Sequence, residues 1–541
     1  MITLIAFLLF FLIIYFLGRG IFLIFRFKLS SIYEIPINIL YPLFGLFYLG
    51  NITLLINFFF PISSLISYLV LVLPLLLNFL RLRKIKLNLS IKNLATFFFT
   101  PLVLGVSSAN INLAYDAGLY HLNHQKWLQT EKIVFGLSNN HNRFGYSSII
   151  EHINVNFWLE NNYILLHFAN LVFIVVFFQI IYLLLFTEYF KFSVSILIYG
   201  LLDNFGFNGG KNGYIEIESI SKQDTPFAII FIISSYLIYR LLTDNEKKGN
   251  EVLSIVFIFC LFSIELRLLG FINILFLLFT LLKKYNISGA VKIVFKDNFL
   301  TIFLGIAFIV KNLITSSCMF YPVKITCFDF LPWSTGNYSS PGAENDALAD
   351  FHIALTRNNY MNWFTEWTEK EVNFIVFKNA MLTFSIIILF NLFYKVIKKE
   401  DFNKSSITLL IYFIISLLIW IITSPGIRFG VGIFLTFVLF ISVLYKSKKS
   451  DFIIRNIIFS TMLYFIVLGL VPQTNNYFSL IDNFFDTRVR SIEVPDVIYK
   501  SNLGGYGVLP EKGDQCWVNL ECVRNKTLSK EKYFSYVIFK R

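Results

Sequence analysis

Charged residues are scarce in this sequence. Asp, Glu, Lys and Arg make up 15% of its 541 residues, whereas hydrophobic residues make up 56% and the mean hydropathy is +0.68. In soluble domains, about a quarter of the residues are charged. A water-soluble fold could therefore not bury the apolar surface of this chain. Many segments instead reach the ~20 apolar residues that cross a bilayer. We therefore predict an all-α polytopic membrane protein.

Internal repeats, low-complexity linkers and a cleavable signal are also missing. The first apolar segment, 2–25, is long enough to span and no A-x-A site follows it, so we expect it to remain as a helix. The lack of a repeat disfavours a transporter built from two related halves. The net charge of +13 arises largely from lysines and arginines in short loops. That pattern indicates membrane orientation and is no sign of a nucleic-acid partner.

The apolar segments predict about fourteen transmembrane helices. Four short connections, around Arg83, Lys284, Lys398 and Lys448, are rich in basic residues, which places them in the cytoplasm. Both termini and the long loops 107–160, 203–223 and 317–372 then lie outside. Residues 1–470 would form the transmembrane domain, and 471–541 a small outer C-terminal cap. The spans run roughly over 2–25, 35–58, 63–81, 93–106, 161–186, 190–202, 225–242, 251–267, 269–282, 298–316, 373–396, 406–424, 429–445 and 452–470.

Cysteine is rare as well, with five residues in the chain. Cys318 and Cys327 share one predicted outer loop, Cys516 and Cys522 share the tail, and Cys260 falls within a span. Close pairs on the outer side fit disulfides in an oxidising compartment; free thiols are the alternative. Metal ligation is less expected, because no histidine lies close to either pair in sequence.

The densest polar motif is YDAGLYHLNHQKW (Tyr115–Trp127), in the first large outer loop. Read as a helix, it places four residues on one face, Asp116, Tyr120, His124 and Trp127. Such a helix would lie along the membrane interface, with Tyr120 and Trp127 at headgroup depth. Asp116 could accept a proton from a sugar hydroxyl or ligate a divalent cation at a phosphate. The alternative is that Asp116 caps a helix or aids solubility.

Further polar residues are candidates for contacts to a sugar or a phosphate. His121 with His124 could ligate a metal, or simply form hydrogen bonds. Asp224 is a second acidic candidate, or an N-cap before a span. Arg428 could bind a lipid phosphate or extend to the interface. The remaining candidates are Lys126, His141, Arg143 and the intramembrane Lys311, while Glu265 and Arg267 are expected to pair with each other.

YDAGLYHLNHQKW and VFGLSNNHNRFGYSS together resemble a signature of a group of bacterial polytopic membrane proteins. KNLITSSCMFYP, SPGIRFG and GDQCWVNLEC look like later stretches of the same group. The architecture further resembles the large membrane glycosyltransferases of the C-type fold (GT-C). Members of that superfamily keep an acidic residue in the first large outer loop, and Asp116 is the matching position. This chain differs in that about three spans, rather than one, precede that loop.

The resemblance implies a glycosyltransferase of the bacterial cytoplasmic membrane that acts at the outer face. Its partners would be a polyprenyl-phosphate-linked sugar and a glycan acceptor, in the synthesis of a surface polysaccharide or glycoconjugate. Asp116 would be the catalytic residue. No cofactor is expected, and whether the reaction needs a divalent cation is left open. One alternative is a polymerase of O-antigen or capsule repeat units, and another is a flippase or transporter of lipid-linked sugars without chemistry.

Overall fold

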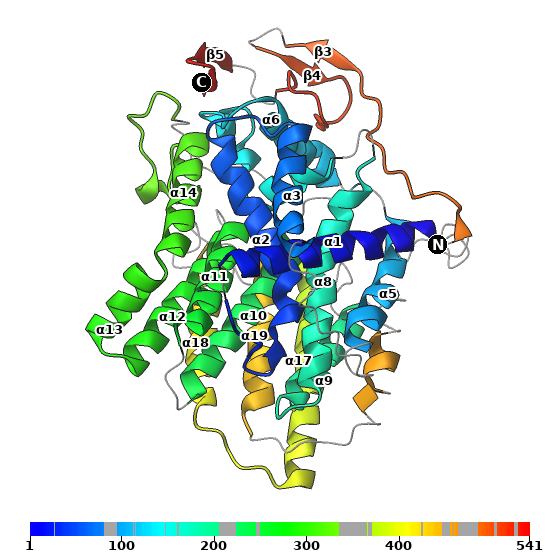
Figure 1. Cartoon of the computed structure of the whole chain (residues 1–541), viewed down its shortest axis with the longest axis vertical. Helices are drawn as coiled ribbons and strands as arrows, with labels where there is room; N and C mark the ends of the chain where they lie inside the picture. Colours follow the sequence, from blue (N-terminus) through cyan, green and yellow to red (C-terminus); the bar gives the residue numbers. More distant parts are fainter. Residues whose placement is uncertain are drawn as a thin grey trace.

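The computed structural model of the chain is mostly helical (Figure 1). Much of the loops 203–223 and 317–372, and most of the expected span 452–470, lie outside the residues that the structure describes. The described residues are 1–25, 27–79, 95–111, 113, 115–146, 148–158, 162–204, 223–244, 249–334, 365, 371–423, 426–445, 455–456, 458–463, 485–502, 506–523 and 528–540.

Within these described residues, seven helices are long and apolar enough to cross a membrane, which supports the predicted class. The higher count of about fourteen spans depends on shorter apolar helices. The seven are α1 (Ile2–Ile24), α2 (Ile37–Asn57), α8 (Ile164–Leu184), α10 (Asp224–Thr243), α14 (Phe299–Ser316), α17 (Glu371–Lys398, apolar over 380–398) and α18 (Ser406–Thr423). The shorter helices include α3 (Ser64–Phe79), α5 (Thr100–Gly105), α9 (Phe190–Asn204), α11 (Asn250–Leu266), α12 (Phe271–Lys284) and α19 (Ile427–Val443).

Helices α8 and α10 form the centre of the bundle. Nearly every side chain along both is buried, the pattern of a helix that is apolar all round and covered on all sides. In contrast, α12, α14 and α18 leave large apolar side chains such as Phe279, Phe303 and Ile411 exposed. A bundle in a bilayer needs no polar cover there, because lipid tails solvate apolar side chains. These outer helices therefore present the lipid-facing surface.

Helices α1 and α2 cross with their backbones in contact (Figure 1). A Cβ atom at Gly18 would lie 1.6 Å from the carbonyl oxygen of Tyr41, and one at Gly45 would lie 2.8 Å from that of Ile14. Only glycine fits at such a distance, and small residues at a crossing are the usual way in which membrane helices approach closely. This crossing anchors α1 against the helix that leads to the outer segment.

The outer segment between α5 and α8 is a series of short helices covered by strands from the C-terminal tail (Figure 1). The backbone of Phe135 joins the two parts, since its N–H donates to Val537 (3.0 Å) and its carbonyl accepts from Phe539 (2.9 Å). The short helices are η3 (Val106–Asn110), η4 (Ala117–His121), α6 (Leu122–Thr130), η5 (Leu137–Asn139), η6 (Asn142–Tyr146), α7 (Ile149–Asn154) and η7 (Val155–Phe157). The strands form two antiparallel hairpins, β3 (Tyr499–Ser501) with β4 (Val508–Pro510), and β5 (Ser529–Tyr533) with β6 (Tyr536–Lys540).

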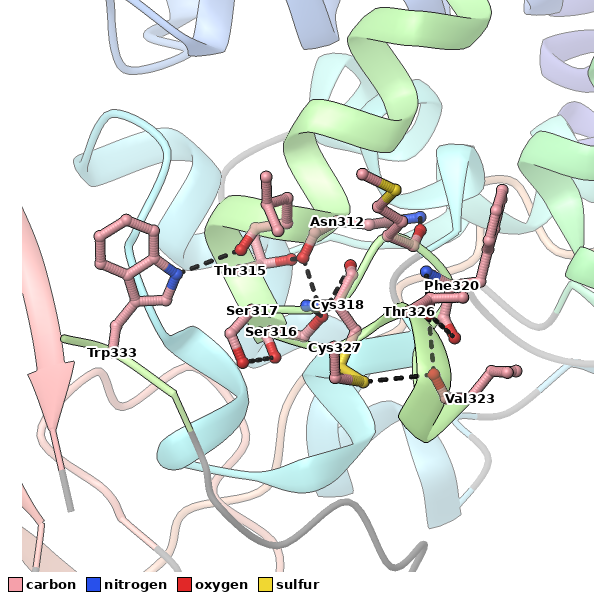
Figure 2. The surroundings of a disulfide bond; sticks show 12 residues. Asn312, Thr315, Ser316, Ser317, Cys318, Phe320, Val323, Thr326, Cys327 and Trp333 are labelled. Atoms are coloured by element: carbon pink, nitrogen blue, oxygen red, sulfur yellow. Dashed lines mark hydrogen bonds between the residues drawn. A yellow bond between two sulfur atoms is a disulfide. The ribbon is translucent and has the colours of Figure 1, made fainter. Parts of the chain in front are cut away.

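Two disulfides join the paired cysteines. Cys318 bonds to Cys327 just beyond the end of α14, and Cys516 bonds to Cys522 in the tail, while Cys260 is free and buried. Figure 2 shows the first bond closing a short loop that Thr326 ties back to the backbone of Phe320 and Val323. The remaining short elements are β1 (Ser31–Ile32), β2 (Ile35–Pro36), η2 (Ala95–Phe99), η8 (Leu268–Gly270), α13 (Ile287–Lys292), η9 (Ile293–Asp297) and η10 (Lys324–Thr326).

Candidate functional site

Asp116 stands at the start of the helical stretch formed by η4 and α6. Its side chain is half-buried and accepts no capping hydrogen bond from the helix that it precedes. The carboxylate has no hydrogen-bond or ion-pair partner among the residues that the structure describes. The capping role considered for Asp116 is therefore not seen, and the carboxylate is free to interact with a substrate.

Tyr120, one turn further along, lies among the charged groups of the site. Burial, and then the charges of Asp116, Asp224 and Glu151, raise the pKa of the Tyr120 hydroxyl well above its ordinary value, while Arg143 opposes them. Tyr120 therefore stays protonated and keeps its O–H as a hydrogen-bond donor in a region that these charged groups influence.

Asp224 opens α10 and holds two arginines. Its carboxylate lies 3.0 Å from Nη2 of Arg267 and 3.9 Å from Nε of Arg428. Both guanidinium groups also lie against the ring of Phe429, at 3.6 Å and 4.8 Å from its centroid. Two guanidinium groups therefore meet at one carboxylate. Guanidinium groups form paired hydrogen bonds to phosphate, so this arrangement suits an anionic group.

The expected pairing of Arg267 with Glu265 is wrong. Glu265 lies at the last turn of α11, where it accepts a hydrogen bond of 2.9 Å from Nδ2 of Asn51. Arg267 follows the helix in extended conformation (φ −157°, ψ 139°) and forms an ion pair with Asp224 instead. The change from helical to extended backbone sends neighbouring charges to different partners.

A second layer of polar side chains is buried beneath α6. Nδ1 of His121 lies 2.5 Å from one carboxylate oxygen of Glu151, and Nε2 of Gln125 donates to the other at 2.7 Å. The indole N–H of Trp158 donates to Gln125 at 2.7 Å and completes the chain of bonds. A buried carboxylate needs such partners. His121 thus holds Glu151, which was not expected to have a role.

Lys311 is buried in α14 and faces this layer. Glu265 and Glu151 are the carboxylates that act on its ammonium group, which also lies 4.4 Å from the centroid of the Phe308 ring. A buried amine is tolerated in a membrane helix when it meets opposite charge. Lys311 therefore lies within the electrostatic influence of the carboxylates of α7 and α11.

His124 and His152 line a small cavity together with Lys311, Trp127 and Thr315. Their imidazole rings lie 6.5 Å apart and are almost fully buried. Burial, reinforced by the charge of Lys311, lowers the pKa of His124 to about 3 and that of His152 well below its ordinary value. Both rings are therefore neutral in the folded protein at ordinary pH.

This neutrality predicts that the protein loses stability in mild acid. Below pH 6.5 the unfolded chain binds protons that these two rings cannot bind when folded, so stability falls as the pH drops from 6.5 toward 3. At pH 5.5 each histidine would cost roughly 1 kcal/mol. The melting temperature in detergent at pH 7.5 and 5.5 checks this for wild type and His152→Phe. The acid-induced drop should be smaller in the variant, and equal drops would contradict the prediction.

The tail fixes the helix that carries Asp116. The backbone N–H of Trp517 donates to the carbonyl of Gly118 (2.8 Å), and a Cβ at Gly118 would lie 2.5 Å from the Trp517 ring. Tyr115 donates through its hydroxyl to Asp514. Trp517 lies in the loop closed by Cys516 and Cys522, and Asp514 lies just before that loop. The cap thus holds the first turn of the site.

The ring of Trp127 does not reach the surface of the molecule. Trp127 is buried under the cap, with its ring 5.5 Å from that of Phe539 and edge-on to it.

Of the other candidates, Lys126 places its ammonium 5.7 Å from the centroid of the Trp158 ring. His141 accepts a hydrogen bond of 3.0 Å from the backbone N–H of Arg143 through Nδ1, which makes it part of the support of the loop.

A comparison with known protein families identifies the family of this chain. Residues 1–435 match the model of the family described as Domain of unknown function (DUF8201). The chain belongs to the DUF8201 family. The DUF8201 match contains every site residue from Asp116 to Arg428, whereas the cap lies beyond it. No curated protein and no solved structure matches the chain.

A divalent cation needs several ligands in one place. Among the described residues, no group of three or more His, Cys, Asp or Glu side chains is placed to hold a metal ion. Asp224, the carboxylate that shares the surroundings of Tyr120 with Asp116, is already paired with two arginines. Mg²⁺ and Ca²⁺ prefer several oxygen ligands, and the described carboxylates do not gather to supply them.

Sequence reasoning missed Glu151 and the role of Arg267. Both are charged residues in apolar surroundings, in SSIIEHINVNFW and SIELRLLG. A charge in such a stretch is the signal that could have drawn attention to Glu151, because it is costly to bury without a partner. The partners themselves come from other segments and carry no local signal.

Proposed function

We propose that this DUF8201 protein is a glycosyltransferase with a GT-C-like arrangement of about fourteen spans. It transfers a sugar from a polyprenyl-phosphate-linked donor at the outer face of the cytoplasmic membrane, in the synthesis of a surface polysaccharide or glycoconjugate. The observation that carries the proposal is the carboxylate of Asp116, which has no partner among the described residues. Its charge acts on the Tyr120 hydroxyl together with the charges of Arg143 and of Asp224, which pairs with Arg267. A base beside phosphate-binding cations is what this transfer requires.

The transfer is a direct displacement. The acceptor hydroxyl oxygen attacks the anomeric carbon of the sugar, and the bond from that carbon to the phosphate oxygen breaks. Asp116 takes the proton of the hydroxyl as general base, and the polyprenyl phosphate leaves with the electron pair of the broken bond. The O–H of Tyr120 is placed to bind a sugar oxygen beside Asp116.

Arg267 and Arg428 bind the phosphate of the donor. Asp224 holds both guanidinium groups in position, and Phe429 supports them from one side. Positive charge fixed in advance stabilises the negative charge that grows on the leaving phosphate. Lys311 acts instead within the buried layer, where it balances Glu151 and Glu265.

A second candidate function is transport of a lipid-linked sugar. The buried Glu265 and Lys311 favour it, because ionisable residues inside apolar helices often mark a transport path. A polymerase of lipid-linked repeat units would use the same side of the membrane and the same class of donor. It differs from the leading proposal only in the acceptor.

Deletion of the gene, with complementation by the full chain, tests the proposal. A transferase predicts that a surface glycan is lost or truncated. The lipid-linked donor then accumulates at the outer face of the membrane. There it can be oxidised by a reagent that attacks sugar diols and does not cross the membrane. A flippase predicts a donor that accumulates out of reach of the oxidant, and a polymerase predicts single repeat units in place of long chains. An unchanged surface glycan would refute the enzyme proposal.

A further inference from the structure

Helices α13 and η9 form one short continuous helix, 287–297, at the edge of the molecule between α12 and α14 (Figure 1). Tyr285 ends α12 in extended conformation, and the side chain of Asn286 caps the new helix by accepting from the N–H of Gly289 at 2.8 Å. The chain therefore changes direction before this helix and again at Asn298, after it.

The surface of this helix is divided lengthwise. Ala290 and Ile293 are buried against the bundle, with 5% and 6% of their surface exposed. Three large apolar side chains face outward at a spacing of four residues, Ile287 (74% exposed), Val291 (50%) and Phe295 (63%). Next to this apolar row runs a second exposed row, formed by Ser288, Lys292 and Lys296.

The apolar row continues onto the helices on either side. Phe279 and Leu282 of α12 and Phe299 and Phe303 of α14 are all exposed. Helix α14 has 18 residues, so it is about 27 Å long, close to the thickness of the hydrocarbon core. The Cys318–Cys327 bond lies beyond its far end. The helix 287–297 therefore lies at the opposite membrane boundary from that disulfide.

We propose that the helix 287–297 lies in the plane of the membrane and binds anionic phospholipid of the inner leaflet. Ile287, Val291 and Phe295 insert at the level of the upper acyl chains, and Lys292 and Lys296 contact lipid phosphates. Lys283, in the last turn of α12, adds positive charge at the same boundary. An apolar face with lysines beside it is the pattern of interfacial helices that prefer anionic lipids.

The preference for anionic lipid can be measured on the full-length protein. Purified protein is placed in vesicles of phosphatidylcholine mixed with phosphatidylglycerol, extracted, and the lipids that remain bound are quantified by native mass spectrometry. Each lysine near the surface contributes about 1 kcal/mol. The double variant Lys292→Gln/Lys296→Gln should therefore retain at least about fivefold less phosphatidylglycerol relative to phosphatidylcholine. The double variant Lys500→Gln/Lys512→Gln, which removes two exposed lysines from the cap, should behave as wild type.

A nitroxide attached at Val291→Cys tests the depth of the helix independently. It should be relaxed by oxygen, which concentrates in lipid, and protected from a water-soluble nickel chelate. A nitroxide at Lys500→Cys should show the reverse. The proposal is overturned if the label at 291 is as accessible to nickel as the label at 500, or if equal lipid ratios are found for both double variants. Dipolar broadening between labels at 291 would indicate that a second copy covers this face, which also contradicts the proposal.

Discussion

Asp116→Asn should abolish the surface glycan while the protein remains in the membrane at the wild-type level. The substitution keeps the shape of the side chain and removes its charge and its ability to accept a proton. A general base contributes roughly a hundredfold to ten-thousandfold to the rate, so glycan formation should fall by at least about a hundredfold. Asp116 has no bonding partner in the described part of the chain, so its replacement should leave the fold intact.

Complementation of the deletion strain checks this, with glycans separated on gels and membrane levels compared by immunoblot. Asp496→Asn is the matched control, because Asp496 is an exposed aspartate of the tail. Full glycan with Asp116→Asn at normal protein level would remove Asp116 from the mechanism. Loss of glycan in both variants would point to a general effect of charge on the outer surface.

Lys191→Met should cause a large loss of stability, because it breaks a buried ion pair outside the site. Nζ of Lys191 lies 2.5 Å from a carboxylate oxygen of Glu400, with 1% and 0% of the two side chains exposed. It also donates to the carbonyl of Tyr445 at 3.0 Å, so it joins the ends of α9, α17 and α19. Removal of one partner leaves a buried carboxylate without a counter-charge, which costs about 3–5 kcal/mol.

Thermal denaturation in detergent, followed by loss of the monodisperse peak in gel filtration, measures this effect. The melting temperature of Lys191→Met should fall by roughly 3–4 °C. The double variant Lys191→Met/Glu400→Gln should recover most of the loss, because no charge is then left unpaired. Lys398→Met, which changes an exposed lysine of α17, should change stability by less than about 0.5 kcal/mol. Equal stability of Lys191→Met and Lys398→Met would show that the buried pair contributes little.

The cap explains why the site depends on the tail although the tail lies outside the DUF8201 match. Trp517 covers Gly118, and Phe539 packs on Trp127, so both ends of the helical stretch from 117 to 130 are covered by residues of the tail. Nothing in YDAGLYHLNHQKW indicates this cover. The aromatics of that motif are equally compatible with a membrane interface, and only the packing separates the two.

The sequence by itself determined the membrane class and the positions of the long helices. An apolar run of about 20 residues can satisfy its backbone in lipid only as a helix, so α2, α10 and α14 fall where the runs predict them. The motif around Asp116 was also visible, because polar residues are conspicuous against so apolar a chain.

Only the tertiary structure decided which charges meet. Arg267 bonds to Asp224 instead of the nearby Glu265, and Glu151 is held by His121 and Gln125. Hydrogen bonds and ion pairs act over a few ångströms, so the partner of a buried charge depends on which helices pack together. Helix packing joins segments that are distant in sequence, and the spacing of residues along the chain does not encode it.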